Sequence, residues 1–191
     1  MIQEIKSWSL SYQNESELVG TVPCSMYSIL LAHGKMDDPF YRLNEYAARV
    51  MSEEDCTLTA SFPADEEALS APRQLLRFLG VDTLADIRLN GTRLGRDVKG
   101  LLRSENTVEV YFESPMRAAH EAAAKYPLWG VTHTTVDGYQ HIRKSHCMYG
   151  WDWGPQLPDM GLFRPVQLVT YHDAEIRDVW VRQKHENGRV K

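Results

Sequence analysis

Alternation of apolar and polar side chains with a period of two is the feature of this sequence that most limits what it can fold into. In an extended segment this period places the apolar side chains on one face, which is typical of a half-buried strand. Because Gly, Pro and Asn separate several such segments, they predict a mostly β, antiparallel sandwich. The pattern is clearest in three sets of residues: Cys56, Leu58, Ala60 and Phe62; Ala85, Ile87 and Leu89; Val108, Val110 and Phe112.

Turn and helix signals lie between these segments. Asn90-Gly91 stands between two strand-like segments and is typical of a type I′ turn, so it predicts a hairpin. Helices are expected over residues 23–33 and 116–126, each bounded by a Gly or a Pro. A further helix is expected at about residues 44–54. The apolar positions of the first two helices indicate that they plug the ends of the sandwich.

The end of the sequence changes character. Residues 176–182 resemble a new strand and residues 185–188 a turn, after which the sequence stops. A strand and a turn without a partner strand are not stable alone. We therefore expect residues 1–172 to form the sandwich domain and residues 173–191 to begin a second, truncated domain.

Composition and charge narrow the range of partners. The chain has 191 residues, of which 43% are apolar and 25% charged, as in ordinary globular proteins. A net charge of −5 with scattered Lys and Arg provides no basic patch for nucleic acid. No apolar run approaches the ~20 residues of a membrane helix, and the start of the chain lacks a signal-peptide core. We expect a cytoplasmic protein without nucleic-acid or membrane partners.

The cysteines and histidines favour neither a disulfide framework nor a metal centre. Cys24, Cys56 and Cys147 are odd in number and widely spaced, which predicts reduced, buried thiols. His141 and His146, with Cys147, superficially offer metal ligands, but neither helical spacing nor a third ligand is evident. Nucleotide-binding and serine-hydrolase motifs are absent as well. The sequence therefore predicts no metal and no cofactor.

Residues 143–155 form the segment with the richest set of ligand-binding side chains. Trp151 and Trp153 flank Asp152 between glycines that allow unusual backbone angles. Such a set suits a carbohydrate, because an aromatic face covers the apolar side of a pyranose and a carboxylate accepts hydrogen bonds from its hydroxyls. The alternative interpretation is that both indoles anchor the core while Asp152 caps a turn. The spacing alone leaves both interpretations open.

A family resemblance favours carbohydrate binding. Residues 150–155 resemble the Trp-Asp-Trp-Gly-Pro signature of β-mannosidases in glycoside hydrolase family 2. Residues 161–166 resemble the Gly-x-x-Arg-x-Val motif that ends the sugar-binding domain of that family. The resemblance covers nearly the whole chain, because further matches occur in the family's order: Val22-Pro23, Asp38-Pro39, Asn44-Glu45, residues 78–83, Leu89-Asn90-Gly91 and Arg143-Lys144.

The resemblance implies a jelly-roll-like, galactose-binding-domain-like sandwich, followed in the full enzyme by an immunoglobulin-like domain and a (β/α)8 barrel. In such enzymes the Asp of the signature reaches into the barrel's pocket and binds the mannosyl unit, and a neighbouring Trp walls that pocket. By position these residues are Asp152, then Trp151 and Trp153. Arg143 either orients Asp152, lines the same wall or is a structural ion-pair partner. The implied partners are a mannoside or other carbohydrate and the rest of the parent chain.

No catalytic residue of such an enzyme is expected in this chain. A retaining glycosidase uses two carboxyl groups about 5–5.5 Å apart, and in the family both glutamates belong to the barrel. The acidic clusters at residues 53–55 and 65–67 lie on polar stretches and are expected to be solvated. The chain alone should therefore be inactive and should contribute only substrate-binding residues to a family 2 glycosidase.

Two positions depart from the family pattern. After the predicted hairpin, Gly95 runs directly into Arg96-Asp97, where the family has an extra extended segment of ~5–10 residues. Either the protein lacks this segment or the sequence omits it, and omission is favoured because a missing strand beside the pocket would damage the sheet. We therefore expect a break or spatial gap between Gly95 and Asp97. Asp55-Cys56 stands where the family commonly has Asp-Trp, a change that is expected to alter packing rather than function.

Two other classes of function stay open on the sequence. One is a free-standing carbohydrate-binding module that uses Trp151 and Trp153 as an exposed platform. The other is a purely structural interaction domain in which Asp152 is buried and ion-paired. The strand expected at residues 176–182 favours the glycosidase domain over the free-standing module, and the structural domain stays open.

Overall fold

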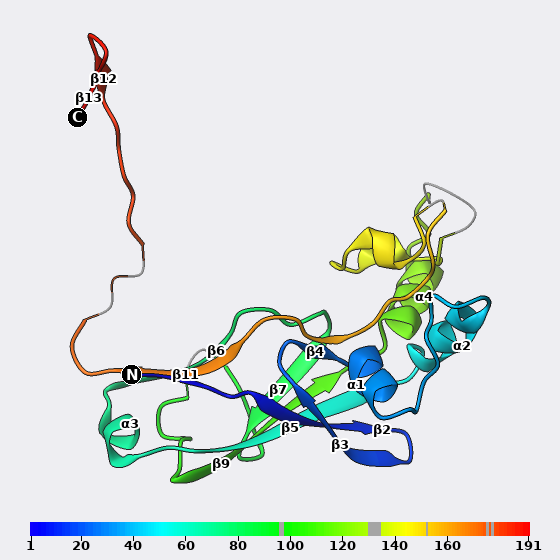
Figure 1. Cartoon of the computed structure of the whole chain (residues 1–191), viewed down its shortest axis with the longest axis horizontal. Coiled ribbons are helices and arrows are strands. Elements are labelled where there is room, and N and C mark those ends of the chain that lie inside the picture. The colour runs from blue at the N-terminus through cyan, green and yellow to red at the C-terminus, as the bar shows by residue number, and fades with distance from the viewer. Residues whose placement is uncertain (96–97, 130–134, 152, 175, 177) are drawn as a thin grey trace.

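The structure is a two-sheet sandwich with most of its helices gathered at one end (Figure 1). This computed structural model describes residues 1–95, 98–129, 135–151, 153–174, 176 and 178–191. The larger sheet is antiparallel and has the strand order β3-β2-β5-β9-β7-β8. Its strands are β2 (Ser7–Tyr12), β3 (Glu15–Thr21), β5 (Cys56–Pro63), β7 (Ala85–Leu89), β8 (Thr92–Arg93) and β9 (Glu105–Phe112).

A smaller antiparallel sheet, in the order β1-β11-β6, covers the larger one. It consists of β1 (Ile2–Glu4), β11 (Val166–Tyr171) and β6 (Arg73–Phe78). One hydrophobic core joins the sheets, since Leu58 and Val110 of the larger sheet belong to the same buried cluster as Leu168 of the smaller. The predicted antiparallel sandwich is confirmed.

The alternating segments are placed as predicted. In β5 the four apolar residues of one face, from Cys56 to Phe62, are each at most 3% exposed. They lie opposite the buried face of β9, because the two strands pair from Cys56↔Phe112 to Pro63↔Glu105. A period of two thus becomes a continuous apolar surface across neighbouring strands.

The predicted hairpin is also confirmed. Asn90 and Gly91 join β7 to β8, with φ angles of 51° and 80° that fit a type I′ turn. The gap expected after this hairpin falls on Arg96 and Asp97, which lie outside the described residues, so it stays a prediction.

Three helices occur near the predicted positions and a fourth was not foreseen. They are α1 (Met26–Ala32), α2 (Asn44–Met51), α3 (Glu66–Ser70) and α4 (Pro115–Lys125). The first begins at Met26 rather than Pro23, because Cys24 and Ser25 form strand β4 (Cys24–Ser25) against β10 (Gly161–Leu162). Ser25 is also the N-cap of this helix, because its Oγ accepts the Ser28 N–H at 3.1 Å.

The two predicted end plugs have different outcomes. Helix α1 buries Ile29 and Leu30 in the sandwich core, as expected. Helix α4 does not plug that core: its Met116 belongs to a separate buried cluster with Val136, Tyr139 and Tyr149. The prediction for α4 was wrong because its apolar side chains pack on the long loop that follows it, which contains two 3-10 turns, η1 (Tyr139–His141) and η2 (His146–Met148).

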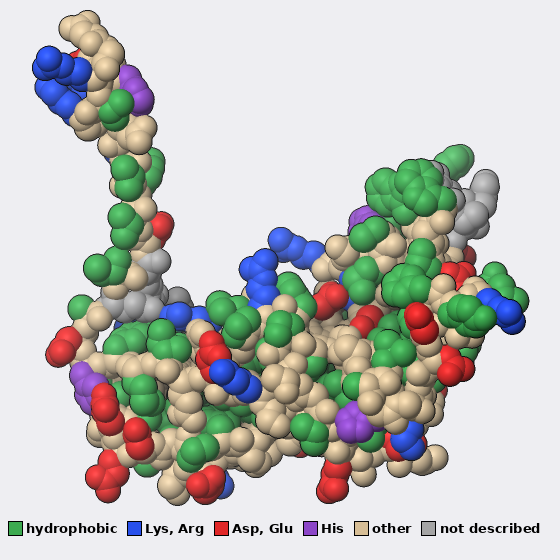
Figure 2. All heavy atoms as spheres, in the orientation of Figure 1, with side chains coloured by type: hydrophobic (Ala, Val, Ile, Leu, Met, Phe, Trp, Pro, Cys, Tyr) green, Lys and Arg blue, Asp and Glu red, His purple; other side chains and the backbone are tan. Residues whose placement is uncertain are grey.

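The C-terminal segment departs from expectation. The residues described between 176 and 182 form no strand, and Trp180 is 77% exposed. Figure 2 shows hydrophobic side chains along this projecting segment. The strand prediction was wrong because an extended segment becomes a strand only when a partner accepts its hydrogen bonds. The predicted turn is confirmed, at Asn187-Gly188 between β12 (His185–Glu186) and β13 (Arg189–Val190).

Burial of the thiols follows the prediction at two of three positions. Cys24 and Cys56 are buried free thiols, whereas Cys147 is exposed because it stands in the irregular loop after α4. Among the described residues no helix is long and apolar enough to cross a membrane.

Asp55 fastens α4 to the larger sheet, so the expectation that residues 53–55 are wholly solvated was wrong for this residue. Its carboxylate accepts hydrogen bonds from the Tyr111 hydroxyl at 2.5 Å, from the Ser114 N–H at 2.8 Å and from Arg117. Burial alone would raise the pKa of Asp55, but these hydrogen bonds and the Arg117 charge lower it below its ordinary value.

Asp55→Asn should therefore destabilise the fold in a pH-dependent way. Because the folded pKa lies below the unfolded value of about 3.9, the stabilisation is complete above that pH and is lost as the pH falls toward the folded pKa. We expect a loss of about 1–2 kcal/mol at pH 7 that shrinks below about pH 4. Urea denaturation of both forms between pH 3 and pH 7 measures it. A constant difference across that range, or an equal loss in the exposed control Asp37→Asn, would contradict the prediction.

Candidate functional site

The segment with the predicted sugar-binding residues is a closed loop, here called the signature loop (residues 150–155). Its base is a bridge between Tyr149 and Gln156, and the Gly154 N–H donates to the Gly150 carbonyl at 2.7 Å. Gly150 has a φ of 101°, and a Cβ at this position would lie 2.8 Å from the Gln156 side chain. The glycine is therefore required both for the backbone angle and for the close approach of the loop's two ends.

The two tryptophans of this loop are exposed. Trp151 is 46% exposed and Trp153 is 83% exposed, so the interpretation of both as core anchors was wrong. Indoles left in water have apolar surface available for a ligand or another protein surface. Asp152 lies outside the described residues, so its proposed contact with sugar stays a prediction.

Two elements hold the base of the signature loop. On one side, Arg49 of α2 donates from Nη1 to Oε1 of Gln156 at 2.5 Å. On the other side, Tyr149 is fully buried, with its ring 6.1 Å from that of Tyr139 in the cluster that α4 covers. The exposed tryptophans thus stand on a base that two helices support.

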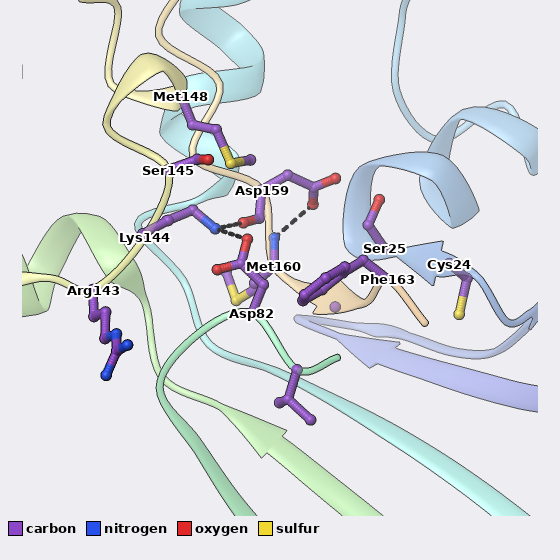
Figure 3. Close-up of a pocket in the computed structure, with 12 residues that line it drawn as sticks. Cys24, Ser25, Asp82, Arg143, Lys144, Ser145, Met148, Asp159, Met160 and Phe163 are labelled. Carbon is purple, nitrogen blue, oxygen red and sulfur yellow. Dashed lines mark hydrogen bonds and ion pairs between the residues drawn. The ribbon is translucent and has the colours of Figure 1, made fainter. Parts of the chain in front are cut away.

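A cavity of about 460 Å³ lies beside the loop, between β4, β10 and the segment that precedes the signature (Figure 3). Its apolar wall includes Met148, Met160 and Phe163, and Arg143 stands at its edge. The Arg143 side chain is exposed and points away from the charged cluster at the back of the cavity (Figure 3). Arg143 therefore lines a pocket, but Trp151 and Trp153 do not line it.

The charged cluster at the back of this cavity was not foreseen from the sequence. Lys144, with a side chain that is 0% exposed, donates from Nζ to Oδ2 of Asp82 at 2.5 Å and to the main-chain carbonyl of Asp159. The Asp159 carboxylate in turn accepts the N–H groups of Tyr27 at 3.1 Å and Met160 at 2.8 Å. The buried ammonium therefore connects three segments that are distant in sequence.

The electrostatics of the cluster follow from burial. Burial lowers the pKa of Lys144, and the negative charges of Asp82 and Asp159 oppose this shift. Burial raises the pKa of Asp159 above its ordinary value, although its hydrogen bonds and the Lys144 charge oppose this shift. In the sequence, Arg143-Lys144 and residues 78–83 stand out only as matches to the family. Neither match indicates that Lys144 and Asp82, which are 62 residues apart, form an ion pair.

Metal binding has no structural support in the part of the chain that is described. No group of three or more His, Cys, Asp or Glu side chains there could hold a metal ion. His141 bonds through Nε2 to the Tyr126 carbonyl at 2.8 Å, and His146 packs edge-on against Tyr139. These contacts give both rings structural neighbours in the loop after α4.

The two packed antiparallel sheets and the loop with exposed indoles define the class of the protein, a β-sandwich domain. Residues 8–164 match the family described as glycosyl hydrolase 2 galactose-binding domain-like. This chain belongs to that family.

Sequence relatives point to one group of enzymes. The chain is 30% identical to the β-mannosidase of Rattus norvegicus in an alignment 188 residues long that covers 89% of this chain and 21% of that protein. It is also 30% identical to β-mannosidase B of Emericella nidulans, over 90% of this chain and 22% of that protein. The chain thus spans about a fifth of the length of these curated relatives.

Solved structures agree on the fold. The β-D-mannosidase of Dictyoglomus thermophilum matches with a TM-score of 0.88 and 28% identity, over 98% of this chain and 24% of that one. An exo-chitosanase of Amycolatopsis orientalis matches with a TM-score of 0.65 and 16% identity, which shows a shared fold alone.

Proposed function

We propose that this chain is the non-catalytic N-terminal domain of a β-mannosidase-type glycosidase and contributes sugar-binding residues to an active site completed by the rest of the parent chain. In this proposal residues 1–172 are the sugar-binding sandwich and residues 173–191 begin an immunoglobulin-like domain. The substrate class is terminal β-D-mannosides.

The observation that carries the proposal is the exposure of the signature loop on a supported base. Trp153 is 83% exposed in a loop whose two ends are bridged at Tyr149 and Gln156. A folded protein gains nothing in stability from holding a large indole in water. This exposure is explained if the loop completes a pocket together with a second protein surface. The resemblance of residues 150–155 to the β-mannosidase signature implies such a pocket. The similarity to β-mannosidases makes a mannoside the favoured ligand.

A second function is kept because the same exposure fits it. A free-standing carbohydrate-binding module would use Trp151 and Trp153 as a flat platform for sugar rings. The two functions differ in one requirement, since a module binds sugar by itself whereas a pocket-completing domain needs the rest of its parent.

The test compares the parent protein, expressed from the reading frame that continues beyond Lys191, with residues 1–191 alone. We expect the parent to hydrolyse an aryl β-mannoside in preference to the matching β-glucosaminide. The isolated chain should hydrolyse neither, since this proposal assigns the nucleophile and the acid/base to the barrel of the parent protein. A stop codon after Lys191 together with millimolar or tighter mannose binding by the chain would establish the module instead. Preference of the parent for the glucosaminide would overturn the substrate class.

A further inference from the structure

The fully buried Lys144 ammonium joins the two ends of the chain segment that contains the signature loop. Lys144 lies before the loop and Asp159 lies after it, and the Lys144 ammonium donates to the Asp159 main-chain carbonyl. The same ammonium donates to the Asp82 carboxylate, which stands on the connection that follows β6. One side chain therefore ties both ends of the loop segment to the sandwich (Figure 3).

The Asp82 anchor is itself fixed to the sandwich. The Asp82 N–H donates to the Gly161 carbonyl at 2.9 Å, and the Gly161 N–H donates to the Asp82 carbonyl at 3.0 Å. Gly161 starts β10, which pairs with β4, and a Cβ on Gly161 would lie 2.5 Å from the Cys24 carbonyl. The ammonium is thus attached to a tightly packed part of the fold.

An ion pair of this kind is poorly explained by stability alone. Taking the Lys144 ammonium fully out of water is costly, whereas the Asp82 carboxylate stays 25% exposed, and apolar replacements of buried ion pairs are often neutral or stabilising. A side chain such as Met would fill the space of Lys144 beside Met148 and Met160. What only the ammonium supplies is two directed hydrogen bonds that set where the loop segment lies.

We propose that Lys144 is the positioning residue of the signature loop, holding the segment between Lys144 and Asp159 in the position that presents Trp151 and Trp153 to substrate. The inference rests on the proposed function for its effect on activity. Its structural part, the tether between Lys144, Asp82 and Asp159, is independent of which ligand the loop meets.

The decisive variant is the double substitution Lys144→Met with Asp82→Asn, made in the full-length parent protein. It removes the ammonium together with its ion-pair partner, and the Asp159 carboxylate keeps the hydrogen bonds from the Tyr27 and Met160 N–H groups, so the melting temperature should stay within about 3 °C of wild type. The tether is still lost, so hydrogen exchange of the amides in residues 145–158 should rise about tenfold. A displaced loop should lower kcat/KM for an aryl β-mannoside at least about tenfold, mainly through kcat.

The controls separate positioning from folding. Lys144→Met alone leaves Asp82 without its cation and should lose both melting temperature and activity. Lys35→Met removes the exposed ion pair with Glu15, whose atoms lie 2.8 Å apart, and should change neither. If the double variant recovers kcat/KM and loop protection along with its melting temperature, Lys144 has no positioning role. If the wild-type parent hydrolyses no β-mannoside, the proposed function fails, and hydrogen exchange alone then decides the tether.

Discussion

Asp152→Asn in the full-length parent protein should lower kcat/KM for a β-mannoside by at least about tenfold. The substitution keeps the shape of the side chain but removes the charge of the acceptor, and a hydrogen bond to a charged group contributes about 1.5–3 kcal/mol. A loss of about 1.4 kcal/mol corresponds to a factor of ten. Sugar contacts of glycosidases often strengthen in the transition state, so the loss should include kcat and not KM alone. Steady-state kinetics on an aryl β-mannoside measure both constants.

The stability of the same variant distinguishes a ligand contact from a structural one. A carboxylate that faces an open pocket supports few contacts of the folded state, so we expect little change in melting temperature. Asp37→Asn, at an exposed position outside the signature loop, is the matched control and should change neither activity nor stability. A large fall in melting temperature with near-normal activity per folded molecule would identify Asp152 as a structural carboxylate.

Gly138→Ala should be among the most destabilising single substitutions in the chain. Gly138 has a φ of +82°, and a Cβ there would lie 1.9 Å from the Ala119 carbonyl oxygen and 2.6 Å from its carbon. Backbone atoms of α4 cannot yield as a flexible side chain can, so the helix must move away from η1 and open the cluster around Tyr139 and Tyr149. We expect a loss of about 3 kcal/mol, or a fall of about 6–12 °C in melting temperature.

Gly91→Ala is the matched control for this prediction. Gly91 has nearly the same backbone angle, with a φ of +80°, but a Cβ there would meet nothing within 4 Å. Its free energy of unfolding should therefore fall by about 1 kcal/mol, which is the cost of placing a Cβ in the left-handed conformation. Urea denaturation of both variants gives the comparison. Equal losses would mean that close packing of α4 on the following loop contributes nothing to stability.

Some features could be predicted because their causes are local. The alternation in residues 56–62 determines which face of β5 is apolar, whatever strand lies beside it. Asn90-Gly91 forms a turn because these two residues tolerate positive φ angles. The start of α4 follows from Ser114-Pro115, since Ser114 Oγ accepts the Arg117 N–H at 3.0 Å.

Other features escaped prediction because their causes are contacts between distant segments. The start of α1 moved because Cys24 and Ser25 found a partner strand at Gly161 and Leu162. Residues 176–182 have the composition of a strand but no partner in the described chain. Asp55 lies in an acidic cluster that resembles solvated surface, yet Tyr111 and Arg117 surround its carboxylate.

The candidate site shows the same division most clearly. By itself the sequence determined that two indoles flank a carboxylate, between glycines that allow unusual backbone angles. Only the tertiary structure decided that Trp151 and Trp153 are exposed and that Lys144 is buried against Asp82. Periodicity and turn preference act over a few neighbouring residues, so they can be recognised in a single chain. Burial and charge pairing depend on which distant segments pack together, and that is settled only when the two sheets and the loop after α4 assemble.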